Sequence, residues 1–195
     1  NQERDCLMQG VIAAVPTPID ADRAPIKELF LEHCQWALAN GCDGLNILGS
    51  TGEANSFDVA SRHTVMFWAA ERLPKDRLMV GTATPSLQET ISLTEYADDL
   101  GYGIALVLPP YYYSPVSDEG LISWYWALHD ALGRRPIQIY FYNYPQMTGI
   151  GIPVTVISDL VRYAPERFMG IKDSSGDLNY CRAIVTANSA LRVFP

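Results

Sequence analysis

Lys172 is the residue in this 195-residue chain whose type and position most directly suggest chemistry. It ends a short apolar run that begins at Phe168, and Asp-Ser-Ser-Gly follows it at once. The run is typical of a strand bounded by turn residues, which would put the amine at the mouth of a buried strand. An amine that loses hydration there favours its neutral form, which can attack a ketone and form a Schiff base. The alternative is a strand-end lysine that extends to solvent or pairs with Asp173.

Two tyrosine-containing segments follow other apolar runs. Tyr142 stands in the sequence YNYP, at the end of the run that begins at Ile137. A tyrosine hydroxyl at a strand end can transfer protons, whereas the alternative is a packed core aromatic. The tyrosines at 111–113 form a second cluster, and at least two of them are expected to serve packing or an interface.

The sequence Gly-Ser-Thr-Gly-Glu at 49–53 lies between a predicted strand and a predicted helix. Its two glycines let the backbone approach a ligand closely, and hydroxyls and amides near a helix start can hold an anion. On its own the segment also fits an ordinary polar turn. The histidines fall within predicted helices of the outer layer and are assigned no catalytic role: His33, His63 and His129.

These segments are positioned by a repeated pattern of short apolar run, turn and helical segment. The expected strands are 10–15, 44–48, 78–80, 104–108, 137–142, the run that carries Lys172, and 191–194. The expected helices are 26–40, 57–72, 87–100, 119–132, 153–163 and 177–187. Ser56 is the expected cap of the second helix, and Pro153 the expected first residue of the fifth.

Strands that alternate with helices predict an α/β protein with a parallel sheet and right-handed crossovers. An open doubly wound sheet and a closed barrel both satisfy this pattern. Reactive residue types follow several different strands, which favours a (β/α)8 TIM barrel, and no nucleotide-binding glycine motif is present. We expect a single barrel domain over 1–195. It contains the first six βα units and strand seven, so it is C-terminally incomplete against the roughly 250 residues of a full barrel.

Composition limits the partners. The net charge of -8 argues against nucleic acid, and 48% hydrophobic with 18% charged residues is typical of a globular protein. No apolar run approaches the ~20 residues that span a bilayer, and the first six residues form no signal peptide. The cysteines show neither metal-ligand spacing nor a disulfide framework, so reduced thiols in a cytoplasmic protein are expected: Cys6, Cys34, Cys42 and Cys181.

Taken together and in order, GSTGE, PPYYYSP, YNYP and GIKDSSGD resemble the dihydrodipicolinate synthase / N-acetylneuraminate lyase superfamily. These proteins are class I pyruvate aldolases and lyases with TIM-barrel folds of about three hundred residues. The resemblance extends from Gly10 to Phe194. It implies a small-molecule substrate, pyruvate or a 2-keto acid with an aldehyde, and a homo-oligomer, a dimer or homotetramer. No metal or organic cofactor is implied, because the substrate forms a covalent imine with the protein.

The resemblance also implies roles for individual residues. Lys172 would form the imine, and Tyr142 would act as the general acid and base. Ser50 and Thr51, with Gly52 in the same turn, would bind the substrate carboxylate. Tyr112 would reach across a dimer interface into the neighbouring site, and Ser50 would link the two tyrosines in a proton relay.

One position departs from the synthases. They carry an arginine two residues after the YNxP proline, which binds the carboxylate of the incoming semialdehyde, and Met147 stands there in this chain. A methionine cannot make a bidentate carboxylate contact. The motifs YNYP and PYYY resemble those of the 2-keto-3-deoxy sugar-acid aldolases more closely. The hypotheses are therefore such an aldolase, a 4-hydroxy-tetrahydrodipicolinate synthase, or a non-catalytic barrel that binds a 2-keto acid.

Overall fold

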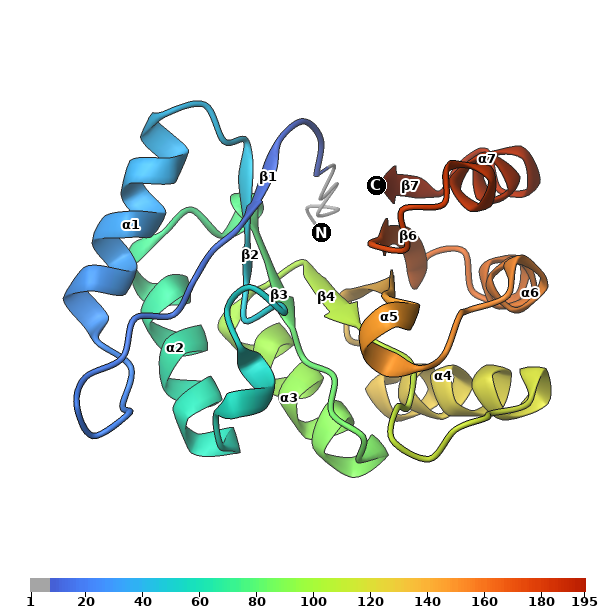
Figure 1. The fold of residues 1–195 in the computed structure, drawn as a ribbon, viewed down its shortest axis with the longest axis horizontal. Coiled ribbons are helices and arrows are strands. Elements are labelled where there is room, and N and C mark those ends of the chain that lie inside the picture. Colours follow the sequence, from blue (N-terminus) through green and yellow to red (C-terminus); the bar gives the residue numbers. More distant parts are fainter. Residues whose placement is uncertain (1–7) are drawn as a thin grey trace. The chain divides into compact units, whose positions relative to one another are not determined.

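The computed structural model describes residues 8–195, in which strands and helices alternate along the chain (Figure 1). The strands are β1 (Ile12–Ala14), β2 (Gly44–Ile47), β3 (Leu78–Gly81), β4 (Ile104–Val107), β5 (Gln138–Asn143), β6 (Phe168–Asp173) and β7 (Arg192–Phe194). The α-helices are α1 (Lys27–Ala39), α2 (Val59–Arg72), α3 (Leu87–Leu100), α4 (Asp118–Leu132), α5 (Pro145–Thr148), α6 (Val154–Tyr163) and α7 (Leu178–Ala187). Two short 3-10 helices are η1 (Ala54–Ser56) and η2 (Lys75–Arg77).

Each predicted strand and helix is present, with ends within two residues of those expected. The cap of α2 is the main correction. Ser56 belongs to η1, and Asp58 caps α2 by accepting a hydrogen bond from the backbone N–H of Ser61 at 2.7 Å. Pro153 is the cap residue of α6, with extended backbone, and the helix begins one residue later. The one-turn helix α5 was not among the predicted elements.

The strands lie in the sheet in their order along the chain, β1 to β7. The pairings of β1 with β2, β2 with β3, β5 with β6 and β6 with β7 are all parallel. By compactness the chain divides into two parts, residues 8–82 with Leu93–Ala105 and Ala83–Ser92 with Leu106–Pro195. A single domain over 1–195 therefore stays a prediction.

The first part has an apolar core between β1–β3 and helices α1 and α2, which pack against each other (Figure 1). Leu45 and Ile47 of β2 and Phe30 of α1 are fully buried there. Tyr102 is buried with them, and its hydroxyl donates to the carbonyl of Met66 at 2.8 Å. The buried phenol is thereby satisfied, and its burial raises its pKa.

In the second part, α4, α6 and α7 lie side by side along one side of β5–β7 (Figure 1). An aromatic cluster fills the layer between them: the ring of Tyr125 packs edge-on against Phe141 at 5.0 Å, and Phe141 stacks on Phe168 at 5.2 Å. The hydroxyl of Tyr125 donates to the carbonyl of Val107 at 3.0 Å. Aromatic packing with satisfied hydroxyls fixes strand β5 against its helices.

The described cysteines are not paired with one another, and they differ in burial. Cys34, Cys42 and Cys181 are free thiols, and Cys34 lies in the core, where burial raises its pKa to about 12. Cys6 lies outside the described residues. Within residues 8–195, no helix is both long enough and apolar enough to cross a membrane.

Arg167 is a buried cation just before β6. Its guanidinium donates to the carbonyl of Ile137, to the carbonyl of Gly133 at 3.0 Å and to Nδ1 of His129 at 3.1 Å. Nδ1 can accept this hydrogen bond only when it carries no proton. Burial, followed by the positive charge of Arg167, lowers the pKa of His129.

We predict that the closely packed glycine of β6 tolerates no side chain. A Cβ on Gly170 would lie 2.5 Å from two ring carbons of Tyr140, a residue that is itself 1% exposed. Gly170→Ala should therefore lower the free energy of unfolding by about 1–3 kcal/mol through overpacking. Gly151→Ala is the matched control, because nothing lies within 4 Å of its Cβ. Equal stability of the two variants in urea unfolding of the full-length chain would contradict this packing.

We also predict that acid weakens the fold through His129. Its pKa is lower in the folded chain than the ~6.5 of the unfolded chain, so the unfolded state binds more protons. Stability is then complete above about pH 6.5 and falls as the pH drops from there through the folded pKa. His129→Gln, which keeps an acceptor without titrating, should show a smaller loss of thermal midpoint between about pH 7.5 and 5.5. Part of the loss should remain, because burial also lowers the pKa of His63. An unchanged pH dependence would count against this role.

Candidate active site

Lys172 and Tyr142 lie side by side on neighbouring parallel strands. Their Cα atoms are register partners between β5 and β6. Nζ of Lys172 is 3.5 Å from the hydroxyl of Tyr142 and 4.6 Å from the centre of its ring. Tyr142 is only 3% exposed, whereas Lys172 is half-buried. The two residues to which the family resemblance assigns one site are therefore neighbours in the fold, and their catalytic roles stay predictions.

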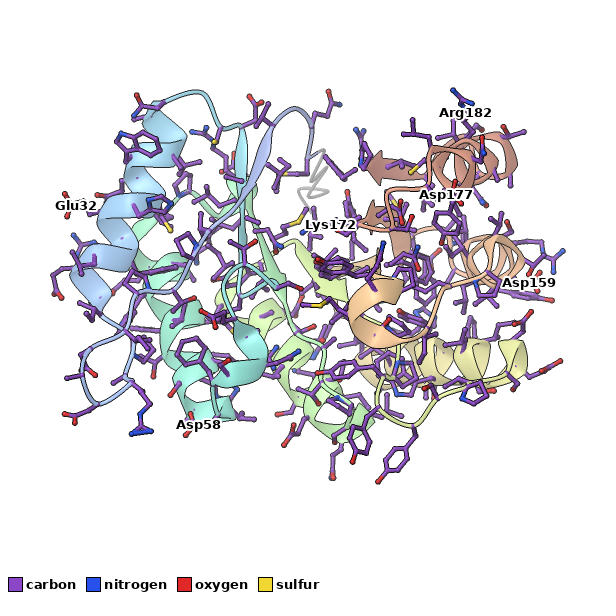
Figure 2. All side chains as sticks on the ribbon, viewed as in Figure 1. Glu32, Asp58, Asp159, Lys172, Asp177 and Arg182 are labelled. Atoms are coloured by element: carbon purple, nitrogen blue, oxygen red, sulfur yellow. The ribbon has the colours of Figure 1, made fainter. Side chains whose placement is uncertain are left out.

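The alternation of side chains along a strand separates this pair from the helix-packing face. Phe141 points to α4 and Asp173 to α7, so Tyr142 and Lys172 point to the opposite face of the sheet. Figure 2 shows Lys172 on the side of β6 that faces away from α6 and α7. The amine is thus presented from the face on which Gly170 and Tyr140 also lie.

A buried polar network on the helix side holds the two strands in this register. Nδ2 of Asn143 donates to Oδ1 of Asp173 at 2.8 Å, and the backbone N–H of Ile152 donates to Oδ1 of Asn143 at 3.0 Å. The backbone N–H of Ser174 donates to the carbonyl of Asn143 at 2.8 Å. Because each strand end is tied to the other by side chain and backbone, a slip of one residue would break several buried hydrogen bonds.

Asp173 therefore points away from Lys172, which disfavours the ion pair but leaves the other alternative, a lysine that extends to solvent. Its Oδ2 accepts from the hydroxyl of Ser175 at 2.8 Å and from the thiol of Cys181 at 3.3 Å. Burial and its hydrogen bond to Asp173 raise the pKa of the Cys181 thiol. Asp177 places Cys181 by capping α7, accepting from the backbone N–H groups of Asn179 and Tyr180.

The turn after β2 carries the predicted anion-binding residues. Ser50 and Thr51 are exposed, and Gly52 is buried. A Cβ on Gly52 would lie 3.1 Å from the carbonyl oxygen of Val15, and the carbonyl of Gly52 accepts from the hydroxyl of Thr17 at 2.8 Å. Glycine is thus required for close packing, while the two hydroxyl residues face outward. Their role in binding stays a prediction.

Tyr112 follows β4 and is 79% exposed. Its φ of +87° is uncommon for a residue with a side chain, and its ring meets that of Tyr113 edge-on at 5.0 Å. A large apolar ring held outward at a strained backbone position fits a contact with another molecule. The predicted role of Tyr112 at a dimer interface is neither tested nor contradicted.

Met147 lies on α5, the one-turn helix directly after the YNYP strand end. It is 70% exposed, and Tyr144 of the same segment stacks on Tyr142 at 5.8 Å. α5 directly follows β5, so Met147 lies shortly after Tyr142 in the sequence. Among residues 8–195 no group of three or more His, Cys, Asp or Glu side chains is placed to hold a metal ion.

Comparison with known proteins gives the same family along nearly the whole chain. Residues 7–194 match the Dihydrodipicolinate synthetase family. A DapA-like lyase of unassigned function from Chloroflexus aurantiacus is 32% identical over 95% of this chain and 62% of its own length. The 4-hydroxy-tetrahydrodipicolinate synthase of Methanothermobacter thermautotrophicus is 32% identical over 88% of this chain and 59% of its own length.

Solved structures share the fold. Dihydrodipicolinate synthase from Agrobacterium tumefaciens superposes with a TM-score of 0.90 at 28% identity, over 94% of this chain and 64% of that one. A pyruvate complex of an E. coli prophage protein of the dihydrodipicolinic acid synthase family gives 0.87 at 26% identity, over 96% and 63%. The 2-keto 3-deoxygluconate aldolase of Picrophilus torridus gives 0.86 at 23% identity, over 94% and 65%, which shows the fold alone.

These matches confirm the α/β barrel class that the sequence predicts, with seven of its strands present in the described residues. The chain spans about three fifths of the length of the curated relatives it matches. With the paired lysine and tyrosine at the ends of β6 and β5, and with a family match over residues 7–194, the chain belongs to the dihydrodipicolinate synthetase family.

Proposed function

We propose that the protein is a class I lyase or aldolase that forms a Schiff base between Lys172 and pyruvate or a 2-keto acid. The observation that carries this proposal is the 3.5 Å approach of the Lys172 amine to the Tyr142 hydroxyl on register-paired strands. A nucleophile within reach of a proton-transfer group is the geometry that covalent catalysis at a carbonyl requires.

In this proposal the neutral amine of Lys172 attacks the keto carbon, and the carbinolamine loses water to give a protonated imine. Tyr142 supplies the proton that leaves with the water and removes protons in later steps. The iminium withdraws electrons from the neighbouring carbon, so that carbon loses a proton, or loses an aldehyde by C–C cleavage, to give an enamine. Addition of the enamine to an aldehyde forms a C–C bond, and hydrolysis of the imine releases product. The imine itself stabilises the carbanion, so the proposed cycle uses no metal or organic cofactor.

The turn that contains Ser50, Thr51 and Gly52 would bind the substrate carboxylate. Backbone N–H groups and hydroxyls in a glycine-containing turn present donors to an anion. Tyr112 would contact a second subunit and complete the proton relay with Ser50, which fits its 79% exposure. A homo-oligomer, dimer or tetramer, and a cytoplasmic location belong to the same proposal.

Among the reactions that differ in their aldehyde, we favour cleavage of a 2-keto-3-deoxy sugar acid to pyruvate and an aldehyde. Met147 offers no donor to a second carboxylate, whereas a guanidinium there would bind one with two hydrogen bonds. The second candidate is condensation of pyruvate with aspartate semialdehyde, because several curated relatives at 32–33% identity are 4-hydroxy-tetrahydrodipicolinate synthases. A barrel that binds a 2-keto acid without chemistry is the third.

We predict distinct effects for variants of the two central residues. Lys172→Ala and Lys172→Arg should both abolish turnover, because an alkyl group has no amine and a guanidinium does not form the imine. Tyr142→Phe should lower kcat by about 10²- to 10⁴-fold, the usual contribution of a positioned acid or base. Steady-state kinetics on the full-length chain, with circular dichroism to check folding, measures both. Near-normal rates in a folded Lys172→Arg variant would refute the proposal.

The aldehyde is identified by comparing the two reactions in separate assays. The full-length chain is assayed for release of pyruvate from 2-keto-3-deoxy sugar acids and for consumption of pyruvate with aspartate semialdehyde. Higher kcat/KM in cleavage supports the aldolase, and higher kcat/KM in condensation supports the synthase. Binding of pyruvate with neither reaction would support the non-catalytic barrel.

A further inference from the structure

Asn46 of β2 carries a buried side-chain amide that the fold does not satisfy. The residue is 2% exposed, and neither Oδ1 nor Nδ2 has a hydrogen-bond partner among residues 8–195. Its backbone has the usual hydrogen bonding of a strand, because its carbonyl accepts a hydrogen bond from the N–H of Val15 at 3.2 Å. The unsatisfied group is therefore the side chain alone, in the middle of an otherwise apolar run.

The amide lies directly beside the predicted carboxylate-binding turn. Register pairs Asn46 with Ala14 and Met79, so its side chain shares their face of the sheet, opposite to the fully buried Leu45 and Ile47. A Cβ on Gly49 would lie 2.5 Å from Nδ2 of Asn46. The absence of a side chain at the first residue of the turn leaves the room that the amide occupies.

A buried amide without partners costs free energy, and a leucine, which has the same branched shape without polar atoms, would not carry that cost. The register partners of Asn46 on that face, Ala14 and Met79, have apolar side chains that offer the amide no hydrogen bond. Unsatisfied buried polar groups in native proteins call for an explanation, and binding of a ligand is one that the position beside the turn supports.

We propose that Asn46 is a binding group for the 2-keto acid: its Nδ2 donates, directly or through one ordered water, to the carboxylate held by the turn that contains Ser50 and Thr51. The inference rests on the proposed function and adds to it a donor from the strand below the turn. A carboxylate accepts hydrogen bonds only, so the amide contributes its N–H groups, and Oδ1 is left to accept from water. Loss of a hydrogen bond to a charged group weakens binding by about tenfold or more.

The test compares Asn46→Leu and Asn46→Val with wild type and with Met79→Leu in the full-length chain. Met79→Leu is the matched control, because it changes a register partner on the same face without changing a polar atom. Two quantities are measured: the pyruvate concentration that gives half-maximal borohydride-trapped adduct, and the thermal midpoint without ligand. The adduct assay needs no knowledge of the aldehyde.

We expect both Asn46 variants to need about tenfold more pyruvate, with thermal midpoints equal to or above that of wild type. Met79→Leu should match wild type in pyruvate requirement. An unchanged pyruvate requirement, or a lower midpoint in both Asn46 variants, would overturn the inference, because the amide would then be part of the protein's own hydrogen bonding. Failure of wild type to form any adduct would instead refute the proposed function, so the two failures are distinguishable.

Discussion

The register between β5 and β6 is the constraint on which the candidate site depends. It places Tyr142 beside Lys172, and the adjacent pair, Asn143 and Asp173, locks it from the other face. The two pairs lie on opposite faces of the strand ends. Tyr142 and Lys172 lie on the face of the candidate site, and Asp173 contacts α7 through Cys181. Because a shift of one residue exchanges the faces of a strand, the network that fixes the register also fixes which side the amine reaches.

The packing around these strands follows from the same alternation. Gly170 stands two residues before Lys172, on the same face, and the ring of Tyr140 fills the space that a side chain there would take. On the helix side, Tyr125, Phe141 and Phe168 form one aromatic cluster. The buried cation Arg167 joins the start of β6 to α4 through His129. The amine is thus carried on a strand that is held along its length on both faces, which would suit the nucleophile of the proposed reaction.

Much of this architecture could be predicted from the sequence, because hydrophobic periodicity and turn residues are local signals. The strands, the helices other than α5 and the barrel class were predicted, whereas a shared site for Tyr142 and Lys172 was implied by the family resemblance alone. The features that were not predicted depend on tertiary contacts or on a single hydrogen bond. Asp58 rather than Ser56 caps α2. Ser56 belongs to the short helix η1, whose end determines which polar residue is in place to cap α2.

Other misses concern side chains whose partners are distant in sequence. Asp173 was considered as a partner of Lys172, but alternation sends it to Asn143, thirty residues away. Asn46 carried a signal that was available from the start, a polar residue inside an apolar strand. That Asn46 is buried and that its amide lacks a hydrogen-bond partner among the described residues can be seen only in the structure.

Reductive trapping shows whether Lys172 forms the proposed imine with a 2-keto acid. The full-length chain is incubated with pyruvate and borohydride, digested, and its peptides are weighed by mass spectrometry. We expect a reduced pyruvate adduct on the peptide that contains Lys172 and none on the peptides of Lys27 or Lys75. A folded chain that gives no adduct at Lys172, or gives it equally at the other lysines, would refute the imine.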